Sequence, residues 1–440
     1  MIKIAKFGGS SVATAEQFKK VKNIITSDES RKFVVVSATG KRFKDDNKVT
    51  DLLYLCHAHI KYSVSCDNIF SLIEERYRSI KEELKLDFDL ESEFVEIRSK
   101  LNKSMNVDYL VSRGEYLTAK LMSEYLGFDF VDAKDIIKFN YDGSMNFAKT
   151  QEAMDFACNG SERMVIPGFY GALPDGTIKI MSRGGSDITG SIIAKMIHAN
   201  VYENWTDVSG MLMGDPRIID NPRRIEKITY SELRELSYMG ANVLHEEAIF
   251  PVKEENIPIN IRNTNEPDNP GTIIVDSCEE KDSDTLITGI AGKKDFTIIG
   301  IYKNHMSNEV GIIKRALEVF EKYNISIEHI PSGIDSFSVV VSSEDVQNNI
   351  YDIIADIKKA CQPTAVKVFE NIALIATVGR NMVYRPGIAG KLFAILGEND
   401  INIRMIAQGS DEINIIVGVE NKDFEKTIKC IYDSFNDKTK

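Results

Sequence analysis

The chain has 440 residues and a formal net charge of −12, with 43% hydrophobic and 27% charged residues. This length allows two or three domains with cores of ordinary size, and the composition is typical of a soluble globular protein. The acidic balance argues against a nucleic-acid or membrane-surface role, because affinity for polyanions comes mostly from Lys and Arg.

The first part of the chain alternates between strand-like and helix-like patterns. Residues 2–7 predict a strand, 15–25 a helix and 33–36 a short apolar strand, whereas residues 52–105 indicate a helical insertion. No apolar run is long enough to span a bilayer, and the N-terminus lacks a signal-peptide pattern. We therefore expect a cytoplasmic α/β protein with a mainly parallel sheet.

The alternation resumes with a short apolar segment at 109–111, which is expected to lead into a helix through Tyr125. Further on, the sequence predicts a helix over 187–198 and strands over 164–166, 177–181, 257–261 and 272–275. Acidic and polar residues at 276–284 then mark a boundary. A first domain is expected over residues 1–284.

An internal repeat follows this boundary at one fixed offset. It pairs residues 324–330 with 400–406, Met306 with Met382, Gly311 with Gly387, Gly333 with Gly409, and Asp335 with Asp411. Each copy predicts the order strand, loop, helix, strand, turn, strand, helix. We expect two α+β modules over 285–362 and 363–440, which are either structural or bind an effector.

Two glycine-rich segments carry the clearest chemical signal. They are Lys6-Phe7-Gly8-Gly9-Ser10-Ser11 and Arg183-Gly184-Gly185-Ser186-Asp187, and each lies where a strand-like run gives way to a helix-like one. Such turns offer backbone amides and a helix N-terminus to phosphate. The alternative is that Ser10 and Asp187 only cap helices while Arg183 is a surface charge.

Other cofactor motifs are missing from the sequence. It contains neither a Walker loop nor a G-x-G-x-x-G after the first strand, which disfavours a dinucleotide-binding dehydrogenase. The six cysteines lack CxxC spacing, and His57 and His59 are two positions apart on a predicted helix. We therefore expect no metal site built from protein ligands alone.

Six motifs, in order and spacing, resemble those of aspartate kinases, which are members of the amino acid kinase superfamily. They span residues 6–13, 112–115, 183–187, 206–210, 215–217 and 243–245. The duplicated tail resembles the paired ACT regulatory domains of the same enzymes. The resemblance implies a carbamate kinase-like α/β fold followed by two ferredoxin-like ACT domains.

The resemblance also implies a reaction. ATP would phosphorylate the side-chain carboxylate of L-aspartate to give 4-phospho-L-aspartate and ADP, the entry to lysine, threonine and methionine synthesis. Mg²⁺ would arrive with ATP, and no general base is needed because an Asp carboxylate is already ionised at neutral pH. Alternatives are phosphorylation of glutamate, acetylglutamate, carbamate or UMP, or a noncatalytic amino-acid sensor on a kinase-like scaffold.

Residue roles follow from the matched motifs. Lys6 would stabilise the transferring phosphoryl group and Asp187 would organise the transfer site. The implied aspartate-binding residues are Ser37, Thr50, Glu115, Arg183 and Ser186, with Glu115 on the amino group and Arg183 on a carboxylate. The implied nucleotide-binding residues are Lys6, Gly8, Gly9, Ser10, Thr206, Asp207, Asp215 and Arg217. The chain departs from many relatives at Leu212 and Asn242, which leaves nucleotide binding there open.

In the aspartate kinases, which this sequence resembles, the ACT pair binds an end-product amino acid across a subunit interface. The resemblance therefore implies a homodimer or homotetramer. The corresponding residues here are Met306, Ser307, Gly311, Ile312, Glu328, Ser332 and Asp335. Glu328 would hold the effector's amino group, and amides after Gly311 would meet its carboxylate. The alternative is that these are turn, cap and packing residues. Lysine is expected as the effector, ahead of threonine.

Overall fold

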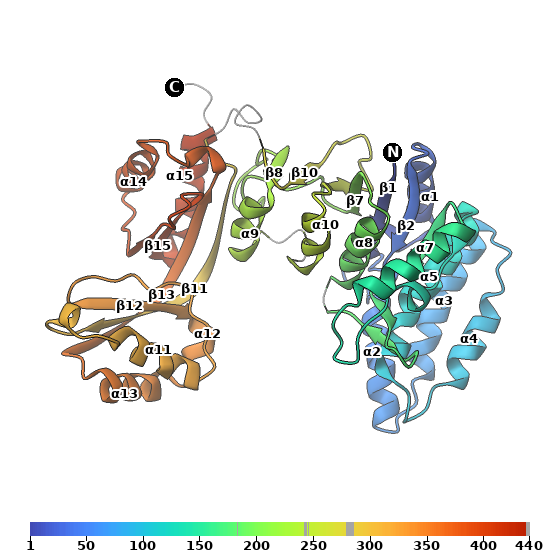
Figure 1. Ribbon diagram of the computed structural model, residues 1–440, viewed down its shortest axis with the longest axis horizontal. Helices are drawn as coiled ribbons and strands as arrows, with labels where there is room; N and C mark the ends of the chain where they lie inside the picture. The colour runs from blue at the N-terminus through green and yellow to red at the C-terminus, as the bar shows by residue number, and fades with distance from the viewer. Residues whose placement is uncertain (183, 242–243, 245, 279–285, 437–440) are drawn as a thin grey trace. The chain divides into compact units, whose positions relative to one another are not determined.

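The protein is described by a computed structural model that covers residues 1–182, 184–241, 244, 246–278 and 286–436 (Figure 1). The chain divides into two compact units. The first unit contains residues 1–211, 226–230 and 243–278, and the second contains residues 212–225, 231–242 and 279–440. None of the described helices is both long and apolar enough to cross a membrane.

The first unit is built on an eight-stranded sheet in the order β3-β4-β2-β1-β7-β9-β10-β8. Its strands are β1 (Lys3–Phe7), β2 (Arg31–Val36), β3 (Asp129–Phe130), β4 (Met164–Pro167), β7 (Val201–Thr206), β8 (Lys227–Thr229), β9 (Ile259–Asn263) and β10 (Thr272–Val275). All neighbours pair in parallel except β9 and β10. The prediction of a mainly parallel sheet in an α/β fold is confirmed.

Helices cover both faces of this sheet. Ala5 and Phe7 of β1 belong to the core that also contains residues of α1 (Ala15–Thr26) and α5 (Val107–Leu126). The helix α8 (Gly185–Met196) packs on β1, β2 and β7, and in Figure 1 α1 and α8 flank β1 and β2 from opposite sides. Successive side chains of a strand point to opposite faces. Lys6, between Ala5 and Phe7, therefore faces α8.

The long segment between β2 and β3 is helical throughout most of its length. It forms α2 (Val49–Lys61), α3 (Asp67–Leu84) and α4 (Leu90–Ser99) before α5. The expected apolar segment at 109–111 is not a separate element, because it lies inside α5, whose N-cap Asn106 accepts a hydrogen bond from the Asp108 backbone. An apolar run on a buried helix cannot be told from a strand by periodicity alone.

Smaller elements complete the first unit. A two-stranded ribbon of β5 (Tyr170–Ala172) and β6 (Ile178–Ile180) precedes α8. The helix α6 (Ala133–Ile136) packs on β5, whereas α7 (Phe147–Gly160) and α10 (Phe250–Glu254) pack against α8. The helix α9 (Tyr230–Tyr238) begins in the first unit and continues in the second.

The second unit contains a five-stranded antiparallel sheet in the order β12-β11-β13-β15-β14. Its strands are β11 (Gly289–Tyr302), β12 (Ser336–Ser342), β13 (Ala365–Val378), β14 (Met405–Ala407) and β15 (Asn414–Glu420). Its helices are α11 (Ile312–Lys322), α12 (Ser343–Val346), α13 (Ile350–Cys361), α14 (Ile388–Glu398) and α15 (Phe424–Asn436). The α+β architecture expected for the tail is confirmed.

The two repeats share their central strands. Residues 289–293 of β11 pair with 374–378 of β13, whereas residues 296–302 pair with the first part of β13. The alternating Ile residues of 324–330 indicate a strand, but this part of the first copy makes only isolated bridges, at His329 and just beyond the segment at Ser332. Pro331 lies between them and has no N–H to continue a ladder. The second copy has β14 at the matching place.

Candidate functional site

Three loops meet where β1, β2 and β7 end. Because β1 lies between β2 and β7 and all three run in parallel, their carboxyl ends share one edge of the sheet. Chain order reverses at β1, since β2 follows on one side and β7 on the other. Such a switch point is the usual place for a ligand in an open α/β sheet.

A pocket of about 630 Å³ occupies this edge. It is lined by eleven of the predicted residues, namely Lys6, Gly8, Gly9, Ser10, Ser37, Thr50, Glu115, Ser186, Asp187, Thr206 and Asp207. These residues come from β1, β2, β7, α2, α5 and α8 or from the loops next to them. The fold therefore collects most of the predicted catalytic, aspartate-binding and nucleotide-binding residues in one pocket.

Lys6 and Asp187 form an ion pair at the base of these loops. Lys6 is only 6% exposed, and it faces α8, where Asp187 lies in the first turn. Asp187 Oδ1 also accepts a hydrogen bond from Asn204 Nδ2 at 3.0 Å. The start of α8 adds the positive end of the helix dipole next to this pair. The arrangement combines a cation and helix N–H groups of the kind that stabilise developing phosphoryl charge.

The helix α8 begins at a glycine pair. Gly184 has a φ of 77°, which favours glycine, and a Cβ on Gly185 would lie 2.5 Å from the Phe169 ring. The segment Gly184-Gly185-Ser186-Asp187 lines the pocket. Because both positions are glycine, the chain can turn sharply into α8 and pass close to Phe169. The first N–H groups of α8 are then available to a ligand.

Glu115 is a buried acid on the wall of the pocket. It projects from α5 and is only 4% exposed, and its Oε2 has no hydrogen-bond partner. Burial raises the pKa of the Glu115 carboxyl to about 8, although hydrogen bonding from the Ala38 backbone and the charge of Arg113 act in the opposite direction. A ligand ammonium group would give this carboxyl the partner that it lacks.

Backbone contacts hold the first two loops together. The Gly40 N–H donates to the Gly9 carbonyl at 2.9 Å. A Cβ on Gly40 would lie 2.6 Å from the Gly9 carbonyl carbon, and a Cβ on Gly9 would lie 2.9 Å from the Ala38 oxygen. Glycine is needed at both positions because the two chains approach so closely.

The loop after β2 adds pocket residues that the sequence analysis missed. Thr39, Gly40, Lys41, Arg42, Phe43, Lys44 and Lys48 all line the pocket. The loop is fixed by Arg76 of α3, which donates to both carboxylate oxygens of Asp46 and to the carbonyls of Gly40 and Asn47. This loop after β2 forms the rim of the pocket. The cluster of Lys and Arg that follows an apolar strand is the sequence signal that could have indicated it.

Three predicted site residues are not placed in this pocket. Arg183 lies outside the described residues. Asp215 and Arg217 belong to the second unit, where Arg217 Nη2 and Asp215 Oδ2 are 2.6 Å apart. That pairing depresses the pKa of the Asp215 carboxyl. The nucleotide-binding roles of Asp215 and Arg217 therefore stay predictions.

The predicted effector residues lie in the second unit. Met306 and Ser307 form a short turn of 3-10 helix, and Gly311, with a φ of 84°, directly precedes α11, which starts at Ile312. Asp335 Oδ1 accepts a hydrogen bond from the His305 N–H at 2.9 Å, which ties it to the Met306 turn. Glu328 accepts a hydrogen bond of 2.6 Å from the Tyr238 hydroxyl. Ser332 forms an isolated antiparallel β-bridge with Phe337.

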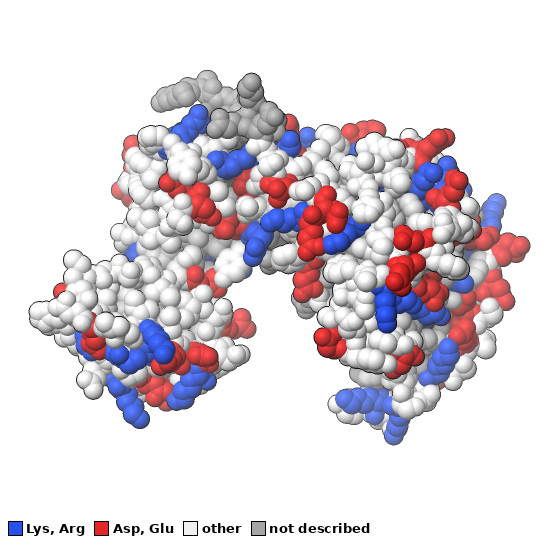
Figure 2. Space-filling view, viewed as in Figure 1, with Lys and Arg blue, Asp and Glu red and all other residues white. Residues whose placement is uncertain are grey.

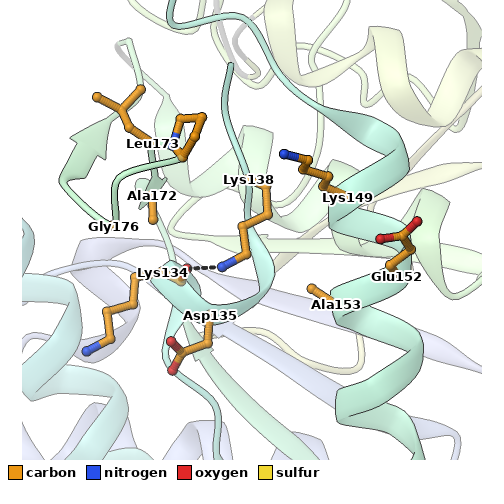
Figure 3. A pocket seen from close by; sticks show the side chains of 10 residues that line it. Lys134, Asp135, Lys138, Lys149, Glu152, Ala153, Ala172, Leu173 and Gly176 are labelled. Carbon is orange, nitrogen blue, oxygen red and sulfur yellow. Dashed lines mark hydrogen bonds between the residues drawn. The ribbon is translucent and has the colours of Figure 1, made fainter. Parts of the chain in front are cut away.

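A second pocket, of about 680 Å³, lies between α6, α7 and the turn that joins β5 to β6. Figure 3 shows its side chains, including Lys138, which donates to the Lys134 carbonyl. Lys134, Lys149, Asp135 and Glu152 are exposed, so opposite charges alternate around it. On the face of the molecule drawn in Figure 2, acidic and basic side chains are likewise interspersed. No predicted site residue lines this second pocket.

The described residues contain no cluster of side chains that could bind a metal ion. Across the ranges covered by the structure, no group of three His, Cys, Asp or Glu residues comes close enough together to hold an ion. Besides Glu115, the carboxylates that line the first pocket are Asp187 and Asp207.

Comparison with known proteins gives a consistent result. A model of the amino acid kinase family matches residues 1–263, and a model of an ACT domain matches residues 375–435. Aspartokinase 3 of Bacillus subtilis (strain 168) is 35% identical over 452 residues, covering 99% of this chain and 98% of that protein.

Solved structures agree with the sequence relatives. The aspartate kinase of Clostridium acetobutylicum is 49% identical, covers 99% of this chain and 100% of its own, and superposes with a TM-score of 0.91. Escherichia coli aspartokinase III, solved in complex with aspartate and ADP, shares the fold, with 23% identity, a TM-score of 0.75 and coverage of 99% and 100%.

Proposed function

Because this chain belongs to the amino acid kinase family, in which it is an ATP-dependent aspartate kinase regulated through ACT domains, we propose that the pocket at the ends of β1, β2 and β7 is its active site. The observation that carries this proposal is the ion pair of Lys6 and Asp187 in a pocket that also contains Glu115. The ATP γ-phosphoryl group is transferred to the side-chain carboxylate of L-aspartate, which gives 4-phospho-L-aspartate and ADP.

The chemistry is mainly electrostatic. The aspartate carboxylate is ionised near neutral pH and attacks phosphorus directly, so no protein base has to remove a proton. Lys6 stabilises the negative charge on the transferring group, and Asp187 orients Lys6 and organises the site. The glycine backbones of Gly8, Gly9 and the start of α8 hold phosphate oxygens.

Aspartate is held by the side of the pocket that contains Glu115. We assign its amino group to Glu115, whose unpartnered Oε2 accepts from an ammonium group, and its carboxylates to Ser37, Thr50, Ser186 and Arg183. The nucleotide lies along Gly8, Gly9, Ser10, Thr206 and Asp207, with Asp215 and Arg217 as further contacts. Mg²⁺ supplies charge neutralisation for the phosphates when bound, and Asp187 or Asp207 offers an oxygen ligand beside phosphate and water.

The placement of aspartate is tested by calorimetric titration. Glu115→Gln should weaken aspartate binding at least tenfold and leave Mg-ADP binding within twofold, because only the ammonium contact is lost. Glu124→Gln, an exposed residue on the same helix α5, is the matched control and should bind both ligands like the unmodified protein. Equal aspartate affinity in Glu115→Gln would contradict the placement.

We propose domain boundaries at residues 1–284, 285–362 and 363–440 and an amino-acid effector bound by the ACT pair. Lysine is the first candidate effector, threonine the second, and a homodimer or homotetramer through the ACT domains is the expected assembly. The enzyme then serves the lysine, threonine and methionine pathways. The effector residues are those around the Met306 turn, the start of α11, Glu328, Ser332 and Asp335, and bound effector favours an arrangement that keeps the kinase inactive.

Inhibition assays on the full chain test this regulation. Lysine should inhibit at lower concentration than threonine, and Glu328→Gln should raise the lysine concentration for half-inhibition at least tenfold without changing uninhibited kcat. Glu318→Gln, on the exposed side of α11, is the control. Unchanged lysine inhibition in Glu328→Gln would remove Glu328 from the effector site.

A further inference from the structure

Asn204 is a buried amide that lies directly beside Lys6, outside every motif that indicated the site. The parallel pairing of β1 and β7 places Lys6 opposite Asn204. Trp205, the next residue, stacks on Phe7 on the face away from α8, so Asn204 points to the α8 face. Only 4% of Asn204 is exposed.

Two residues of β7 donate hydrogen bonds to Asp187. Asn204 Nδ2 donates to Asp187 Oδ1 at 3.0 Å, and Lys6 Nζ forms its ion pair with the same oxygen. Tyr202, two residues earlier on the same face of the strand, donates from its hydroxyl to the Asp187 backbone carbonyl at 3.1 Å. One strand thus holds both the side chain and the backbone of this acid.

The neutral amide suits this position better than a charged or apolar group. A cation beside Lys6 would compete with it for Asp187, and a second carboxylate would hold Lys6 away from a phosphoryl group. An apolar side chain would leave Lys6 as the sole donor to Oδ1 among the described residues that contact it. When Lys6 turns toward a phosphoryl group, Asp187 would then lose the donor that holds it, at the cost of an unsatisfied buried oxygen.

We propose that Asn204 is a positioning residue for phosphoryl transfer, which keeps the Asp187 carboxylate in place while Lys6 shifts its ammonium group to the transferring phosphate. This inference rests on the roles proposed above for Lys6 and Asp187. Asn204 is not among the residues that line the pocket, and in this proposal it acts only through Asp187. Loss of such a supporting contact typically costs about 10–100-fold in activity.

The test compares Asn204→Leu, which keeps the size and removes the donor, with Asn260→Leu. Asn260 is the matched control, because it is a part-buried Asn on the neighbouring strand β9 and does not contact Asp187. Asn204→Leu should lower kcat about 10–100-fold while KM for aspartate and for ATP changes less than about twofold. Asn260→Leu should keep kcat near that of the unmodified enzyme.

A double-mutant cycle distinguishes a failure of the proposed active site from a failure of the proposed role of Asn204. In an Asp187→Ala background, Asn204→Leu should cause no further loss of kcat, because its partner is gone. If Asp187→Ala itself keeps full kcat, the proposed active site is wrong. If Asp187→Ala is impaired but Asn204→Leu has normal kcat, or if the two losses multiply, only the role of Asn204 is wrong. Should Asn204→Leu fail to fold, as judged by circular dichroism, Asn204→Ala is measured in the same cycle with the same expectations.

Discussion

Lys6 of β1, which is buried, and Asp187 of α8, which is part-buried, form an ion pair at the point where the two glycine-rich segments of the chain meet. The pair explains why segments so far apart in sequence act as one site. β1 supplies the cation and the first loop, while α8 supplies the acid and the N-terminal amides. The nearby Asn204 adds a neutral donor to the same carboxylate oxygen.

Removal of either member of this pair should slow the reaction. Lys6→Ala and Asp187→Ala are each expected to lower kcat by about 10²–10³, as for the loss of one preorganised electrostatic contact. Steady-state ADP release measures kcat. Lys3→Ala is the control, because Lys3 lies on the same strand but pairs with Asp28 outside the pocket. Near-normal turnover of a folded Lys6→Ala protein would refute its assigned role.

The buried Glu115 should link aspartate binding to pH. Its pKa of about 8 in the free protein means that it is protonated below pH 8, whereas an ammonium ligand favours the carboxylate. Binding at pH 7 should therefore release close to one proton, and aspartate affinity should rise with pH up to about 8 and then level off. Calorimetry in buffers of different ionisation enthalpy measures the released proton. Glu115→Gln should abolish the release, and proton-neutral binding by the unmodified enzyme would contradict the assignment.

Arg76 should stabilise the pocket rim. It is 3% exposed and pairs with the buried Asp46, which also accepts from the more exposed Arg42. Arg76→Met would leave Asp46 with Arg42 alone and should cost about 1.5–3 kcal/mol, as for the loss of a hydrogen bond to a charged group. Urea unfolding followed by fluorescence of Trp205 reports on this unit, because the chain has a single tryptophan. An unchanged urea midpoint in Arg76→Met would show that the pair is unimportant.

The close approach of Gly40 to Gly9 should make Gly40 intolerant of a side chain. Gly40→Ala places a Cβ 2.6 Å from the Gly9 backbone, and such overpacking costs about 1–3 kcal/mol. The first loop must shift, so KM for ATP should rise about tenfold. Gly160→Ala is the control, because a Cβ there has no atom within 4 Å. A normal KM in Gly40→Ala would argue against phosphate binding by this loop.

Tyr238 should compete with the effector for Glu328. An effector ammonium group would have to displace the Tyr238 hydroxyl, which donates to Glu328 at 2.6 Å. Tyr238→Phe removes a bond with a net value of about 1 kcal/mol, so half-inhibition should occur at about fivefold lower effector concentration. Tyr323→Phe, which loses a comparable hydroxyl–carboxylate contact with Asp356, should leave inhibition unchanged. Weaker inhibition of Tyr238→Phe would mean that the hydroxyl supports the effector.

The sequence predicted the parts of the site that lie at strand ends and helix starts. Lys6 and Asp187 were identifiable because glycines beside a charged residue at such a junction can hold phosphate, and because their motifs occur together with four others in the order found in a known family. Arg76 was not, since a charged residue in a helix with many charges usually faces solvent, and its burial depends on how α3 packs against the loop after β2. Asn204 gave no signal either, because a neutral amide inside a strand becomes meaningful only when its register with Lys6 is known.

The fold, like the site, could be predicted only in part from the sequence. The mainly parallel pairing followed from the alternating patterns along the chain, whereas the strand order is known only from the structure. The apolar residues 109–111 were ambiguous because a buried helix face and a short strand look alike over three residues. The sharing of β11 and β13 between the two repeats depends on long-range pairing, which a local sequence pattern does not contain.

The most direct test of the pocket's assignment is chemical trapping of the product. The unmodified protein is incubated with Mg-ATP and either aspartate or glutamate, and any acyl phosphate is converted by hydroxylamine to a coloured hydroxamate. We predict hydroxamate with aspartate and not with glutamate, and its near-complete loss in the Lys6→Ala and Asp187→Ala proteins. A signal with glutamate but not aspartate, or an undiminished signal in both variants, would contradict the account.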